Sequence, residues 1–131
     1  MRTVLGGIDE RQRPVVRLLL ADRDESFLAL VDTGFNGELY VTDSVALRLG
    51  FERTSNDTPV RLAGDKIVTV VRSAGRIKWL GRELRVQVLI AADTGGRQIE
   101  GEPDALLGTG LLSPHILLVD FTAMTVEIEP Q

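Results

Sequence analysis

Short apolar runs separated by turn signals restrict the fold of this chain more than any other feature. Residues 14–21 and 27–31 are two such runs, joined by the polar residues 22–25 in a way that suits a β-hairpin. Runs this short, bounded by Gly, Asn and Asp, are typical of β-strands. The same pattern predicts strands over residues 3–8, 37–41, 60–62, 67–71, 75–79, 83–90, 116–121 and 125–129, with the apolar pattern resuming at 105–108. The sequence therefore predicts an all-β fold.

One short helix is expected over residues 43–49, with Thr42 capping its start and Gly50 ending it. Val45 and Leu49 share one face of this helix, four residues apart. Residues 92–104 carry several Gly and Pro residues and little apolar content, so they are predicted to form a loop.

The chain has 131 residues, enough for one hydrophobic core but not for two, so residues 1–131 are expected to form a single domain. Its net charge of −4 argues against nucleic acid and anionic membranes as partners. No apolar run approaches the roughly 18 residues of a membrane span, and the first residues lack a signal-peptide core. A cytoplasmic location is the expectation. A loose basic group is expected on the solvent faces of strands: Arg72, Arg76, Lys78, Arg82 and Arg85.

The chain contains no cysteine and one histidine, which argues against a thiolate nucleophile and a zinc site. No metal or cofactor is expected. His115 follows Pro114 and is predicted to be a loop residue, and Trp79 is predicted to pack partially at a sheet edge. Asp120 is expected to shape a closing hairpin.

An Asp-Thr-Gly triplet occurs twice, in two different settings. Asp32 follows the apolar run 27–31, so a buried strand should deliver it, and a carboxylate there is costly unless it is hydrogen-bonded or paired. Thr33 and Gly34 offer a hydroxyl and an unobstructed amide, and this copy is interpreted as functional. The second copy, residues 93–95, lies in the most polar stretch and is interpreted as a loop turn.

The order of several parts along the chain resembles that of retropepsin-type aspartic proteases, the single-domain relatives of pepsin found in retroviruses and as small bacterial proteins. A hairpin precedes the Asp32 triplet, a flap-like hairpin lies around residues 62–66, and the apolar-apolar-Gly motif Leu106-Leu107-Gly108 follows. A helix-like segment at 109–112 and a terminal strand pair complete the order. The resemblance runs from about Pro14 to Glu129 and implies a closed β domain with a flap hairpin and one short helix.

In that family each chain supplies one aspartate, so the resemblance implies that Asp32 pairs with Asp32 of a second subunit in a homodimer. The two triplets of one chain then do not pair with each other, and too little chain follows residue 95 to build a second lobe. Thr33 is implied to hydrogen-bond across the dimer axis, and Gly34 to let backbone and substrate approach the carboxylates.

The substrate implied is a peptide or protein, bound as an extended strand beneath the flap. Residues 106–108 are implied to be a structural motif that supports the Asp32 loop. The implied substrate contacts are Phe35, Asn36, Leu62, Ala63, Gly64 and Asp65.

Two departures from the retroviral pattern leave alternatives open. Phe35 stands where Ala or Ser is frequent, and Thr109-Gly110 follows the second motif in place of a bracing Arg, so dimer stability must come from elsewhere, with the terminal strands as candidates. The expected function is an aspartic endopeptidase. One alternative is a dimeric binding or scaffold module that keeps the fold and cleaves nothing, and another is a protease whose dimer forms only transiently.

Overall fold

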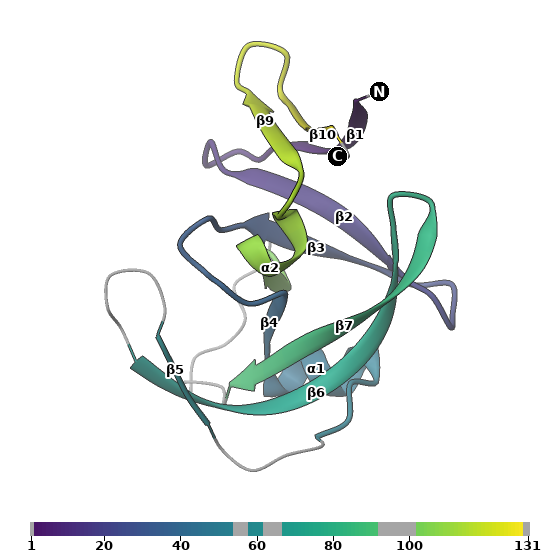
Figure 1. Cartoon of the computed structure of the whole chain (residues 1–131), viewed down its shortest axis with the longest axis vertical. Coiled ribbons are helices and arrows are strands. Elements are labelled where there is room, and N and C mark those ends of the chain that lie inside the picture. Colours follow the sequence, from purple (N-terminus) through teal and green to yellow (C-terminus); the bar gives the residue numbers. More distant parts are fainter. Residues whose placement is uncertain (1, 54–57, 62–66, 92–101, 130–131) are drawn as a thin grey trace.

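The computed structural model describes residues 2–53, 58–61, 67–91 and 102–129, and within them the chain forms ten strands and two short helices (Figure 1). The all-β prediction is confirmed. In chain order the elements are β1 (Thr3–Ile8), β2 (Pro14–Leu20), β3 (Ser26–Val31), β4 (Leu39–Thr42), α1 (Asp43–Leu49), β5 (Thr58–Arg61), β6 (Ile67–Trp79), β7 (Arg82–Ala91), β8 (Ala105–Leu107), α2 (Thr109–Leu112), β9 (Ile116–Asp120) and β10 (Thr125–Glu129).

All ten strands belong to one sheet, in the order β5-β6-β7-β4-β8-β3-β2-β1-β10-β9. A further pairing joins β2 to β6, where Leu19 lies opposite Lys78 and Leu20 opposite Ile77. This contact closes the strands from β6 to β2 into a barrel, which is the closed β domain expected from the sequence.

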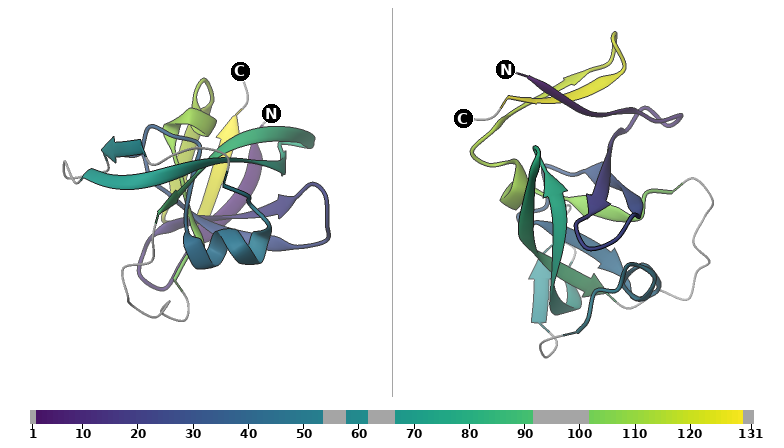
Figure 2. Two further views of the ribbon diagram at one scale, coloured as in Figure 1. Left: turned by 90° about the horizontal axis from the view of Figure 1, so that it is seen from below. Right: turned by 90° about the vertical axis from the view of Figure 1, so that its right-hand side faces the viewer.

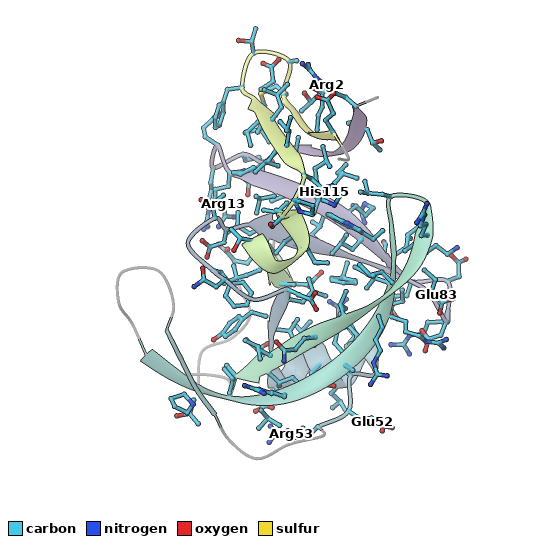
Figure 3. All side chains as sticks on the ribbon, in the orientation of Figure 1. Arg2, Arg13, Glu52, Arg53, Glu83 and His115 are labelled. Carbon is cyan, nitrogen blue, oxygen red and sulfur yellow. The ribbon has the colours of Figure 1, made fainter. Side chains whose placement is uncertain are left out.

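Alternating side chains of the barrel strands fill its interior. In β2 the side chains of Val16, Leu18 and Leu20 point inward and are at most 3% exposed, while Arg17 and Leu19 point outward. In Figure 3 the labelled Arg2, Glu83 and Arg53 lie at the periphery of the molecule, around an interior filled by apolar side chains. The expected basic group does lie on solvent-exposed positions of β6 and β7: Arg72, Arg76, Lys78, Arg82 and Arg85.

The long hairpin β6–β7 differs from the prediction, which placed a break between residues 71 and 75. β6 runs unbroken for 13 residues. Ser73 interrupts the apolar pattern in the sequence, but it is buried and its hydroxyl donates to the carbonyl oxygen of Glu52. Gly75 leaves room for the ring of Phe51, because a Cβ there would lie 2.4 Å from its Cε1 atom. The break was therefore wrong because tertiary contacts accommodate both residues within one strand.

Helix α1 has the predicted bounds, and Gly50 ends it in the left-handed conformation with φ of 78°. Thr42 occupies the N-cap position, but its side chain makes no capping hydrogen bond and its Oγ1 lies 3.3 Å from Ser44 Oγ instead. The expected cap is therefore absent. Neither helix in the described residues is long and apolar enough to cross a membrane.

Trp79 is more buried than predicted. It ends β6 next to a two-residue turn in which Leu80 and Gly81 have φ of 52° and 81°. Its side chain is 6% exposed and its ring centroid lies 6.5 Å from that of His115, so it belongs to the core and does not pack partially at an edge. His115 lies between α2 and β9, outside both elements, as predicted.

Strands β1, β10 and β9 form one end of the molecule and extend the sheet beyond the barrel (Figure 2). Val126 and Ile128 of β10 face the core and are fully buried. Asp120 shapes the turn after β9, as expected, because its Oδ1 atom accepts the N–H groups of Thr122 and Ala123 at 2.9 and 3.0 Å.

Candidate active site

Asp32 follows β3 directly and is held by its backbone. Its N–H donates to the carbonyl oxygen of Leu107 at 2.9 Å, and its carbonyl oxygen accepts the N–H of Phe35 at 3.2 Å. The carboxylate is half-buried, and its Oδ1 accepts the N–H of Gly34 at 2.9 Å. Thr33 and Gly34 are exposed. The triplet is thus a tight turn that places one carboxylate at the end of a buried strand.

Strand β8 fixes both ends of the loop that carries Asp32. It lies parallel to β3, with Val31 opposite Leu107, and antiparallel to β4, with Leu39 opposite the same Leu107. The strand before the loop and the strand after it therefore share one partner. The two sequence motifs, although far apart in the chain, meet here.

Gly108 and the start of α2 lie against the loop with no space between them. A Cβ at Gly108 would lie 2.3 Å from the carbonyl oxygen of Gly37 and 2.5 Å from that of Phe35, so only glycine fits. The N–H groups of Gly108, Thr109 and Gly110 donate to the carbonyl oxygens of Glu38, Phe35 and Gly37 at 3.1, 2.8 and 3.0 Å.

Thr109 stands where the retroviral pattern has an arginine, and it also ties the loop with its side chain. Its hydroxyl donates to the carbonyl oxygen of Phe35 at 3.3 Å, in addition to the backbone bond. From the sequence, this position was interpreted only as the absence of an arginine that braces the loop. A hydroxyl next to a helix start is a weak signal, and only the fold shows that it faces the loop.

The ring of Phe35 supports the loop from its buried side. It is 1% exposed and packs edge-to-face on Tyr40, with ring centroids 6.0 Å apart, in a cluster with Val70 and Leu89. Burial raises the pKa of the Tyr40 phenol. Asn36 lies on the exposed side of the loop. The substrate contacts expected of Phe35 and Asn36 stay predictions.

A pocket of about 220 Å³ lies beside the strands that lead into the site. Leu30, Leu106 and Tyr40 give it an apolar wall. Glu102 and Asp104 also line it, but Asp104 accepts a 2.6 Å bond from Arg48 and the backbone N–H of Leu28 at 3.0 Å. The acidic side chains of its rim are thus engaged by protein groups.

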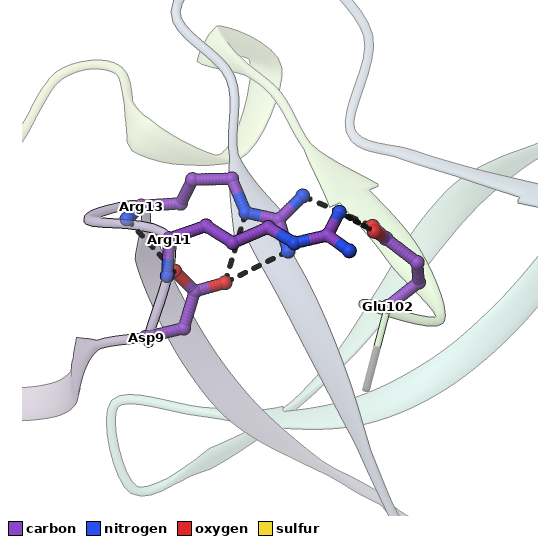
Figure 4. A network of polar contacts seen from close by, with 4 residues as sticks. All are labelled: Asp9, Arg11, Arg13 and Glu102. Carbon is purple, nitrogen blue, oxygen red and sulfur yellow. Dashed lines mark hydrogen bonds and ion pairs between the residues drawn. The ribbon is translucent and has the colours of Figure 1, made fainter. Parts of the chain in front are cut away.

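An ion-pair network connects the turn after β1 with the segment before β8 (Figure 4). Arg13 donates to Asp9 at 2.9 Å and to Glu102 at 3.0 Å, and Arg11 also pairs with Glu102. Burial opposes the charge of Asp9, but hydrogen bonds from Arg13 and Arg11 and the charge of Arg13 hold its pKa below the usual value. The hydrogen bond to Glu102, partly offset by burial, raises the pKa of Arg13. Sequence reasoning missed this network because Glu102 lies far along the chain from Asp9, Arg11 and Arg13.

Several predicted site residues lie outside the described residues: Leu62, Ala63, Gly64 and Asp65 of the flap-like hairpin, and the second triplet at 93–95. Within the described ranges, Asp32 makes no ion pair, and no group of three His, Cys, Asp or Glu side chains is placed to hold a metal ion.

Comparison with known proteins gives a similarity of structure. No family model matches the chain, and no curated protein matches its sequence. Among solved structures, the chain is similar to EIAV protease in complex with the inhibitor HBY-793, with 24% sequence identity and a TM-score of 0.58. The match covers 79% of this chain and 88% of the other. Together with the closed all-β sheet, this similarity shows that the chain has a retropepsin-like fold.

Proposed function

We propose that the protein is an aspartic endopeptidase whose active site forms between two copies, each supplying Asp32. The observation that carries the proposal is the placement of this carboxylate, half-buried at the end of β3 in a loop fixed by β8 and α2. Within the described residues one chain supplies one such carboxylate, and the fold shared with a viral protease supports the pairing of two.

The proposed chemistry follows from two carboxylates about 3 Å apart, which cannot both ionise and therefore share one proton. The ionised Asp32 takes a proton from a water held between the two groups, while the protonated Asp32 donates to the carbonyl oxygen of the scissile bond. The water oxygen attacks the carbonyl carbon to give a tetrahedral diol. The proton taken from the water then passes to the amide nitrogen, while the Asp32 that donated its proton takes one back from a diol hydroxyl. The carbon–nitrogen bond breaks to give an amine and a carboxylic acid, and no acyl-enzyme forms.

Loop rigidity is the contribution of the surrounding residues in this proposal. The Asp32 N–H donates to the carbonyl oxygen of Leu107, and the N–H groups of Thr109 and Gly110 donate to carbonyl oxygens of the loop. These backbone hydrogen bonds hold the loop that carries the carboxylate, so little reorganisation accompanies reaction. Thr33 is exposed beside Asp32, and in the proposed dimer it hydrogen-bonds across the axis. The apolar pocket at Leu30 and Leu106 suits an apolar side chain of an extended peptide.

The test is digestion of an unbiased peptide mixture between about pH 3 and 7, read by mass spectrometry at several protein concentrations. Wild type is compared with Asp32→Asn, which keeps the side-chain shape, and with Asp93→Asn as the matched control in the second triplet. Cleavage should fall by at least about a hundredfold only in Asp32→Asn, and should rise faster than linearly with concentration.

A wild type that cleaves nothing while forming a stable dimer would replace the endopeptidase with the binding or scaffold module. Cleavage that appears only at high protein concentration, with a monomer at low concentration, would identify the transient dimer. Equal loss of cleavage in both Asp variants would remove the special role of Asp32.

A further inference from the structure

Arginine and lysine side chains gather on one outer face of the barrel. On β6, every second residue from Arg72 to Lys78 is exposed, while the residues between them point inward. Arg85 of β7 lies directly opposite Arg76, and Leu19 of β2 lies directly opposite Lys78, so three strands share this outer face. We call its cationic side chains the basic face: Arg17, Arg72, Arg76, Lys78 and Arg85.

The charges of the basic face are largely unbalanced within the described residues. Glu83 lies on it, opposite Lys78, and pairs with Arg76 at 2.8 Å. Both side chains of that pair are more than half exposed, so water weakens their attraction. Lys78 and Arg85 make no ion pair with any described residue. Arg76 and Arg85 also place like charges directly opposite each other, which destabilises a sheet, so an anionic partner would relieve this repulsion.

The carboxylates of the turn between β2 and β3 leave the basic face unneutralised. Glu25 pairs with Arg23 at 3.2 Å, and among the described residues neither Asp22 nor Asp24 pairs with a cation. The basic face thus holds five cations against one carboxylate, on a chain whose net charge is −4. Positive charge is therefore concentrated on this part of an otherwise acidic protein.

Strands β6 and β7 connect the basic face to the candidate active site. Leu89 of β7 packs with Phe35 of the catalytic loop, and the same Leu89 lies directly opposite Arg72. The basic face begins there and continues along β6 to Lys78, about 20 Å away at the rise of a strand. One extended polypeptide can therefore contact both the candidate active site and the basic face.

We propose that the basic face binds an acidic, extended segment of the protein substrate, outside the residues that flank the cleaved bond. This inference rests on the proposed function and names its substrate class: proteins with a run of Asp or Glu at a distance from the cleavage site. Alternate side chains of any extended chain lie about 7 Å apart, so Arg76 and Lys78 match alternate carboxylates of such a segment. Leu19, 42% exposed beside Lys78, adds an apolar contact.

An acidic polypeptide suits the basic face better than other polyanions. Single-stranded nucleic acids bind by stacking their bases on aromatic side chains, and the exposed residues of β2, β6 and β7 that the structure describes include no aromatic one. The net charge of −4 opposes a nucleic acid or an anionic membrane, because their charge extends beyond this face. A short acidic segment carries its charge only where the cations are.

Fluorescence anisotropy tests the binding with a labelled peptide of about eight alternating Glu and Ala residues, long enough to span the basic face. The affinity of wild type should fall as salt is added, because salt screens exposed charges. Arg85→Glu should raise Kd at least about fivefold, since one attraction becomes a repulsion. The new carboxylate lies opposite Arg76, so the sheet keeps its fold, which circular dichroism checks.

Arg82→Glu is the matched control. Arg82 is exposed on the same strand but lies opposite the buried Trp79, on the other face of the hairpin. This variant changes the net charge by the same amount and should change Kd by less than about twofold. Equal weakening by the two variants would attribute binding to net charge and overturn the basic face as a site, as would a peptide that does not bind. Tighter binding of a labelled single-stranded oligonucleotide or of phosphatidylserine vesicles at the same salt would overturn the assignment to a polypeptide.

Cleavage tests the link to the active site. A peptide that is cleaved in the unbiased mixture is made with and without a Glu-Ala tail, placed at either end, and assayed at about pH 6, where Glu is ionised. One tailed form should have KM lowered about fivefold with kcat unchanged. Arg85→Glu should remove this difference and leave cleavage of the untailed peptide as it is in wild type.

The outcomes also separate this inference from the proposed function. If the Glu-Ala peptide binds and Arg85→Glu weakens the binding while no protein cleaves any peptide, the basic face stands as a binding site and the endopeptidase does not. If wild type cleaves but neither tail lowers KM, the endopeptidase stands and the basic face does not hold its substrate.

Discussion

Gly108 is a position at which a single methyl group is expected to disturb the site. In Gly108→Ala the new Cβ would meet two backbone carbonyl oxygens at 2.3 and 2.5 Å, and backbone cannot move aside as a side-chain tip can. Urea unfolding should show a loss of about 3 kcal/mol. Gly7→Ala is the control, since its nearest atom would be 3.2 Å away, and equal losses in the two variants would contradict the packing argument.

Tyr40 is the only tyrosine of the chain, so its ionisation can be followed by absorbance without overlap. Because burial raises its pKa in the folded state, the stability that it contributes is complete below the unfolded value of about 10 and is lost as the pH rises through the higher folded value. Tyr40→Phe should remove this alkaline loss. Urea midpoints for both proteins between about pH 8 and 11 measure it, and parallel curves would exclude the effect.

At the scale of elements, the ion pairs of Asp9, Arg11 and Arg13 with one another and with Glu102 connect the turn after β1 to the segment before β8. We expect this connection to be sensitive to acid. The pKa of Asp9 is lowered, so its stabilisation is present above the unfolded value of about 4 and is lost as the pH falls through the folded value. Asp9→Asn should be less stable than wild type near neutral pH and should converge with it in acid. Urea midpoints measured between about pH 2 and 6 test this.

The exposed Asp24→Asn is the control for this measurement, because Asp24 is not part of the network. A difference between Asp9→Asn and wild type that stays constant down to the lowest pH would show that the charge of Asp9 is not the cause.

The bounds of a strand or helix were predictable where a local sequence pattern alone determines them. The apolar run before Asp32 and the left-handed Gly50 are such cases, and β3 and the end of α1 lie where the sequence placed them. The unbroken β6 was not predictable, because Gly75 is accommodated by Phe51, a residue brought near only by the fold. The hydrogen bond from the Thr109 hydroxyl to the carbonyl oxygen of Phe35 was not predictable for the same reason.

At the scale of the whole molecule, a dimer should make thermal stability depend on protein concentration. Association favours the folded form by mass action, so Tm should rise by about 2–4 °C for each tenfold increase in concentration. Differential scanning calorimetry measures this directly. A Tm that does not change with protein concentration would contradict the proposed dimer.

The shared partner of β3 and β4 has a consequence for the timing of synthesis. Both strands leave the ribosome long before β8, and until Leu107 exists the N–H of Asp32 lacks its acceptor and β4 lacks one of its two partner strands. A nascent or truncated chain therefore cannot order its loop. The Asp32 carboxylate acquires its final position only when most of the polypeptide has been made, so in the proposed endopeptidase an incomplete chain would be inactive.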